Sequence, residues 1–130
     1  MIRLLGGGRL ALGLLIVGAP RLAVRLFGVP RAGDTPDGRF VTRIAGNRDA
    51  VLGAALLLAP RRQRAAVVAA CTAVDAADLL VTLGSARGLG RRTVLANVIA
   101  AGSAAAGGLW ALDRLRAADR GGSSPSDNRG

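Results

Sequence analysis

The chain has 130 residues, and its 18 arginines and 8 aspartates give it a net charge of +10 without any Lys, Glu or His. This length suits a single domain. The absence of His, together with a single cysteine (Cys71), excludes the usual haem, zinc and His-based acid–base sites, and also an internal disulfide or a CxxC redox pair. The arginines are scattered singly or in pairs among apolar runs, and aromatic residues make up only 2% of the chain, so we expect no nucleic-acid partner.

The apolar runs predict an all-α protein of the cell membrane. The longest uncharged stretch, Thr93–Leu112, is long enough to cross a hydrocarbon core of ~30 Å, and Trp110 near its end suits a membrane interface. Arg9 and Arg43 are close enough to segment ends to snorkel. A soluble bundle would need polar outer faces rich in Lys, Glu and Gln, and the chain has one Gln and neither of the others.

The first helix is predicted over residues 2–19, because Pro20 ends or kinks it. Residues 20–30 then form either a short interfacial helix resting on anionic headgroups, with Arg21 and Arg25 on its polar face, or a continuation of the first helix. We expect the first helix to remain uncleaved rather than to act as a signal peptide, since Arg9 interrupts its apolar centre.

Three more helices follow, predicted over residues 36–59, 64–83 and 91–118. Their ends are marked by a capping residue before a Pro, by a further Pro and by glycines. Residues 119–130 are predicted to be a disordered tail by composition. Residues 1–118 are therefore predicted to form a four-helix transmembrane bundle.

The arginines near the helix ends do not settle the membrane orientation. They divide evenly between the two sides that four spans would create, so the positive-inside rule favours neither side. Cytoplasmic termini are the default expectation.

The informative charges lie in the middle of the second and third helices. A charge at mid-membrane costs about 2.5–3.5 kcal/mol on insertion scales, so such residues usually face the bundle and pair. Arg48 and Asp75 lie equally far from the turn between Arg61 and Arg62, which would place them at similar depth. We predict a buried network with Arg48 between or beside Asp75 and Asp78, Arg43 above it, and Asp49 and Asn97 within reach.

Two interpretations of this network stay open. It could be structural, fixing how the second and third helices pack. It could instead line a polar cavity for a proton, an ion or a small polar ligand. The charges of the five predicted ionic members sum to −1, which is nearly neutral and favours the structural interpretation.

Small residues four apart, such as Gly46, Ala50 and Ala54 or Ala100, Ala104 and Gly108, predict close approach of helix backbones. The glycines at 6–8 suit packing or a flexible helix start better than a phosphate loop, since no GK[ST] follows them. Cys71 is expected to be a small core residue.

Within residues 39–60, the pattern Arg39-Phe40, Arg43, Gly46, Arg48-Asp49 and Gly53 resembles a family of small bacterial, actinobacterial-type four-helix membrane proteins of unknown function, loosely similar to DoxX-like proteins. The resemblance implies an integral membrane fold and supplies no activity. The DoxX-like relationship implies a membrane redox accessory role.

The function expected from the sequence is that of an accessory or structural membrane subunit, in a homo-oligomer or with a membrane protein partner. The first alternative is a proton-linked or small-ligand carrier that uses Arg48, Asp75 and Asp78, and the second is the redox accessory role. The residues suggest no catalytic site, cofactor or metal.

Overall fold

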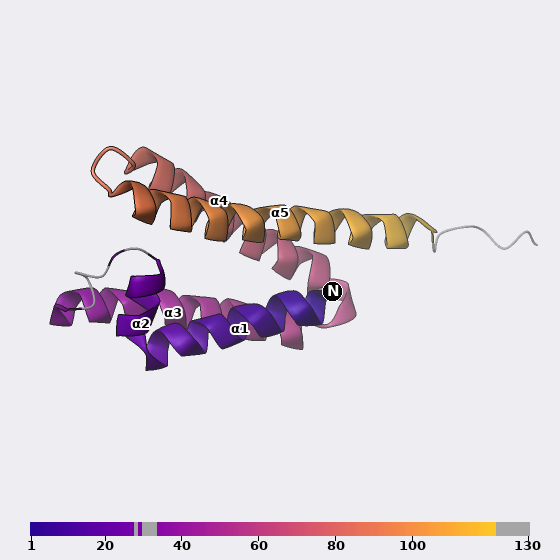
Figure 1. Ribbon diagram of the computed structural model, residues 1–130. Helices are drawn as coiled ribbons and strands as arrows, with labels where there is room; N and C mark the ends of the chain where they lie inside the picture. The colour runs from indigo at the N-terminus through magenta and orange to yellow at the C-terminus, as the bar shows by residue number, and fades with distance from the viewer. Residues whose placement is uncertain (28, 30–33, 122–130) are drawn as a thin grey trace, which may run out of the picture.

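The computed structural model describes residues 1–27, 29 and 34–121, and this part of the chain is helical without strands. Its elements, in chain order, are α1 (Ile2–Gly18), α2 (Pro20–Leu26), α3 (Pro36–Leu58), a short 3-10 turn η2 (Arg61–Gln63), α4 (Arg64–Gly84) and α5 (Arg91–Gly121) (Figure 1).

The helix bounds agree closely with the predicted ones. After Pro20 the chain forms a separate short helix and not a continuation of the first, because α1 and α2 meet at an angle of 116°. Pro20 opens α2 at its first turn, where its missing N–H costs nothing, and it cannot continue α1. At the other end, α5 continues past residue 118 to Gly121, so the first three residues of the predicted tail are helical. The rest of the predicted tail lies outside the described residues.

The helices form two antiparallel hairpins. α1 packs along α3, and α4 packs along α5 (Figure 1). The chain passes from the first hairpin to the second after Pro60, close to the N-terminus. The turn between α4 and α5 lies with α2 at the opposite end (Figure 1).

Close contact between α1 and α3 depends on glycines. A Cβ added to Gly13 would lie 2.6 Å from the carbonyl oxygen of Gly46 and 2.8 Å from the Cα of Ala50. A Cβ added to Gly53 would lie 2.8 Å from the Cα of Leu10. The predicted close approach at Gly46 and Ala50 is therefore confirmed, and its partner is α1.

The apolar core lies where the two hairpins join. Cys71 is buried in it, as predicted. The core residues come from α3, α4 and α5 and are Leu56, Val68, Cys71, Ala111 and Leu112. Away from this end, α3 and α4 share few contacts, and the α4–α5 hairpin forms a separate layer from the α1–α3 hairpin (Figure 1).

Two described helices are long and apolar enough to cross a membrane: α4, with the turn before it, and α5. The bent pair α1 and α2 qualifies only if the two together count as one span. α3 does not qualify, because Arg39, Arg43, Arg48 and Asp49 lower its hydropathy. Length and composition thus support two or three of the four predicted spans.

Candidate functional site

A cavity of about 1020 Å³ lies between the two hairpins, and we call it the inter-hairpin cavity. One face of each of α1, α2, α3, α4 and α5 lines it. The contribution of α5 consists mainly of small side chains one turn apart, among them Ala100, Ala104 and Gly108. Gly108 is in tight contact with Thr72 of α4. Ala100 and Ala104 line the inter-hairpin cavity.

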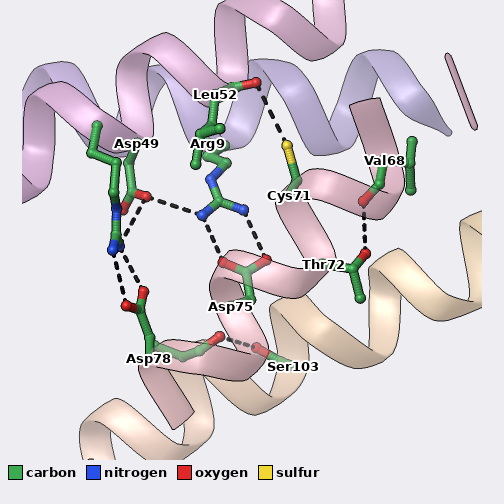
Figure 2. A network of polar contacts seen from close by, with 11 residues as sticks. Arg9, Asp49, Leu52, Val68, Cys71, Thr72, Asp75, Asp78 and Ser103 are labelled. Atoms are coloured by element: carbon green, nitrogen blue, oxygen red, sulfur yellow. Dashed lines mark hydrogen bonds and ion pairs between the residues drawn. The ribbon is translucent and has the colours of Figure 1, made fainter. Parts of the chain in front are cut away.

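Arg9 lies at the centre of α1, on the face that also carries Gly6 and Gly13. Because those glycines press α1 against α3, the side chain of Arg9 is directed past α3 towards α4. Its Nη1 donates to Oδ2 of Asp75 at 2.8 Å, and its Nη2 donates to Oδ1 of Asp75 at 2.6 Å (Figure 2). Nη2 also donates to Oδ1 of Asp49 at 3.0 Å. The Arg9 guanidinium therefore joins α1, α3 and α4.

Asp75 is the buried acidic member of this group. It continues the stripe of α4 formed by Val68, Cys71 and Thr72, and its side chain is 7% exposed. The hydroxyl of Thr72 donates to the carbonyl oxygen of Val68 at 2.8 Å, so it leaves Asp75 to Arg9. The two-point contact of guanidinium and carboxylate is the strong form of this ion pair.

A second ion pair lies beside the first. Arg48 Nη1 and Nη2 donate to the two carboxylate oxygens of Asp78 at 2.9 and 2.6 Å. Arg48 Nη2 also lies 3.5 Å from Oδ1 of Asp49. The side chains of Arg48 and Asp78 are 41% and 39% exposed, so this pair is much less buried than the first.

The five residues make one chain of ion pairs, in the order Asp75, Arg9, Asp49, Arg48 and Asp78, and we call it the ion-pair chain. Two guanidinium groups face three carboxylates, which leaves a formal charge of −1 at the cavity wall. All five residues line the inter-hairpin cavity.

One donor in the ion-pair chain is not satisfied. The Nε–H of Arg9 is buried and has no acceptor among the described residues. Leaving such a donor unpaired costs on the order of 1–3 kcal/mol.

Comparison with known proteins adds no relative. No family model matches the sequence, and no curated protein or solved structure is similar to it at a significant level. The resemblance to DoxX-like proteins therefore stays a prediction, and the site has to be interpreted from its own geometry.

Four of the six predicted network residues come together: Arg48, Asp49, Asp75 and Asp78. Arg48 binds Asp78, as predicted, but it does not bind Asp75, which binds Arg9 instead. The prediction assumed that α3 and α4 pack along their lengths. They instead belong to different hairpins, and α1 supplies the arginine at the level of Asp75.

The other two predicted members lie outside the ion-pair chain. Arg43 is exposed and lines a separate recess beside α2. Asn97 lines the inter-hairpin cavity, but its side-chain amide donates to the carbonyl oxygen of Thr93 in its own helix at 2.9 Å.

The sequence interpretation missed Arg9, which was assigned to snorkelling at a segment end. Two signals could have found it. Arg9 lies near the midpoint of α1, too far from either end to reach an interface easily. It also shares a heptad-like face with Gly6, Gly13 and Ile16, the buried residues of that helix.

The lining of the inter-hairpin cavity suits the binding of a small molecule. Within residues 1–27, 29 and 34–121, no group of three His, Cys, Asp or Glu side chains could hold a metal ion. The cavity offers an apolar wall from five helices together with the ion-pair chain, and this lining can hold an apolar molecule with a polar end.

Proposed function

We propose that this chain is a multi-pass protein of the cell membrane that binds a small amphipathic ligand in the inter-hairpin cavity. The observation that carries the proposal is the cavity itself. Its volume of about 1020 Å³ is that of a ligand site, its walls are mainly apolar, and five of its six charged lining residues belong to the ion-pair chain.

The membrane environment is supported by the distribution of side chains. The charged residues of the ion-pair chain face inwards, whereas large apolar side chains cover the outside. On α3 the exposed apolar residues include Phe40, Ile44 and Val51, and on α5 they include Leu95, Ile99 and Leu109. Such an arrangement suits a lipid solvent.

In this proposal all four long helices span the bilayer. α3 is the fourth span, and it is tolerated because Arg48 and Asp49 are paired inside the protein. On α5, Trp110 is 53% exposed and its ring lies 5.4 Å from the guanidinium carbon of Arg114, which suits the headgroup level.

The charge of the site favours a ligand with a cationic or hydrogen-bond-donating head. The ion-pair chain carries −1, and Asp37 adds a further carboxylate to the lining. An anionic head would be repelled by this patch, and an apolar tail fits beside the small side chains of α5.

A binding series tests the ligand class. We expect the purified protein in a non-ionic detergent to bind decylamine more tightly than decanol, and decanol more tightly than decanoate, as measured by native mass spectrometry. Ala104→Trp fills the cavity and should abolish binding, whereas Ala106→Trp on the exposed side of α5 should not. Equal binding of the three probes, or equal loss in both variants, would refute the site.

Alkaline carbonate extraction tests the membrane placement separately. We expect the protein to stay in the membrane pellet. Release into the supernatant would contradict the multi-pass placement whatever the result of the ligand series.

The second candidate is the accessory or structural subunit, and one observation favours it. The hairpins share a core only at one end, so a helix of another membrane protein could lie between them. Crosslinking in membranes through cysteine introduced at Ala104 would then trap a partner protein, and a protein that binds no probe amphiphile would favour this role.

A further inference from the structure

A second recess, of about 600 Å³, lies at the bend between α1 and α2. Four arginines line it, two from α2 and two from α3, and we call it the arginine recess. Its complete lining consists of Gly18, Ala19, Pro20, Arg21, Leu22, Arg25, Arg39 and Arg43. No carboxylate is among these residues.

The bend at Ala19 positions this recess. Because α2 turns by 116° from α1, it crosses the end of α1 instead of extending it. Ala23 and Val24 of α2 are buried and line the inter-hairpin cavity, while Arg21 and Arg25 are exposed on the other side. Leu22 and Leu26 are also exposed, so the outer side of α2 mixes apolar and cationic residues as interfacial helices do.

The arginines repel one another in the absence of an anion. Arg21 and Arg25 are four apart on α2, and Arg39 and Arg43 are four apart on α3, so each pair places like charges on one helix face. Within the described part of the chain, Arg21, Arg25 and Arg43 form no ion pair with a carboxylate. Three of the four guanidinium groups of the recess are therefore available to an external anion.

The recess lies at the depth of lipid headgroups. Arg43 is 15 residues before Leu58, which corresponds to about 22 Å along α3, and Arg39 lies one turn further. If the end of α3 at Leu58 is at one face of a ~30 Å hydrocarbon core, the arginine recess is close to the opposite face.

We propose that the arginine recess binds the phosphate of an anionic phospholipid. Guanidinium groups bind phosphate oxygens through two parallel hydrogen bonds, and the exposed Leu22 and Leu26 can contact the acyl chains. The proposal rests on the membrane placement given above and does not depend on a ligand in the inter-hairpin cavity. Carbonate extraction tests the membrane placement by itself, so its failure is distinguished from a failure of lipid binding.

The test compares the lipids retained by the purified protein. Wild-type protein is reconstituted in phosphatidylcholine vesicles with or without phosphatidylglycerol, then extracted in mild detergent and measured by native mass spectrometry. We expect phosphatidylglycerol to stay bound and the double variant Arg25→Gln/Arg43→Gln to retain it at least about tenfold less. The matched control, Arg87→Gln/Arg92→Gln, removes the same charge near the α4–α5 turn at the same end of the molecule and should retain the lipid (Figure 1).

Two further measurements distinguish phospholipid binding from attraction by net charge and from binding of a free anion. Equal loss in the control variant would show attraction by net charge and overturn the proposal. Displacement of the lipid by inorganic phosphate at physiological concentration would assign the recess to a free anion and overturn it too. If circular dichroism shows that the double variant is unfolded, Arg25→Lys/Arg43→Lys replaces it in the test. It keeps the charge but loses the two-point geometry, and we expect it to retain less lipid than wild type.

Discussion

Arg9 and Arg48 carry the same charge in neighbouring helices, yet they occupy very different surroundings. Arg9 is 14% exposed and holds both oxygens of the buried Asp75, whereas Arg48 and Asp78 are roughly two-fifths exposed at the cavity wall. Removing one partner from a buried pair leaves an uncompensated charge, which costs far more than the same change in an exposed pair. The two pairs should therefore respond differently to the same substitution.

We expect Asp75→Asn to lower the free energy of unfolding by on the order of 3 kcal/mol, because Arg9 then loses its main counterion. Asp78→Asn is the matched control and should cost less than about 1 kcal/mol, since that pair is exposed and Arg48 keeps Asp49 nearby. Unfolding in mixed micelles with increasing dodecyl sulfate measures both. Adding Arg9→Gln to Asp75→Asn should restore part of the stability. Equal effects of the two single changes would contradict this account.

At the level of single residues, the sequence identified the carboxylates of the ion-pair chain better than it identified the arginine that binds each of them. The cost of a mid-membrane charge is enough to single out Arg48, Asp49, Asp75 and Asp78 from their positions in the apolar segments. The choice of counterion cannot be made the same way, because it depends on which helix faces which. Arg43 illustrates this, since α2 and the bend at Ala19 place it in the arginine recess.

Among the elements, the hairpin of α1 and α3 depends most on small residues. The spacing between Gly6 and Gly13 on α1 equals that between Gly46 and Gly53 on α3, so the two antiparallel helices meet at matched intervals. Gly13 has backbone atoms of α3 directly against the position of a side chain, while Gly7 faces open space.

We expect Gly13→Ala to destabilise the protein by about 1–3 kcal/mol, because the new methyl group must push α1 away from α3. Gly7→Ala adds the same methyl group in open space and should be neutral or stabilising by up to about 1 kcal/mol through helix propensity. Thermal unfolding in detergent, followed by circular dichroism, distinguishes the two. A Gly13→Ala protein as stable as the wild type would show that α1 and α3 do not pack this closely.

Helix positions were predictable because Pro, Gly and capping residues mark the ends locally, as Thr35 does when its Oγ1 accepts from the Gly38 amide. The role of the small residues was less predictable. Ala50 and Ala104 both belong to small-residue repeats, yet the former is a close helix contact and the latter lines the inter-hairpin cavity. A small side chain permits either outcome, and the facing helix decides.

For the whole molecule, rules that apply to a single helix or connection could not predict how the helices group into two hairpins. A short connection usually makes consecutive helices neighbours, which is why α3 and α4 were expected to pair. Here α1 and α3 pair across the bend and α2, and α4 turns away to pair with α5. The inter-hairpin cavity is a product of this grouping, so nothing in a single segment indicates it.

The division of the ion-pair chain between the hairpins has a consequence for biogenesis. The first hairpin contains Arg9, Arg48 and Asp49 and can neutralise its own carboxylate, whereas α4 brings Asp75 and Asp78 without a cation from α5 to pair with them. In the proposed membrane placement, the second hairpin would therefore enter a bilayer in which its counterions are already in place.

Expressed as separate fragments, residues 1–60 should accumulate in membranes alone, and residues 61–130 should accumulate fully only when 1–60 is co-expressed, as immunoblots of membrane fractions would show. Equal amounts of the second fragment with and without the first would mean that Asp75 and Asp78 insert unaided. If the second fragment depends on the first in this way, the first hairpin assists the insertion of the second. The order of the two hairpins along the chain then sets the order of their insertion.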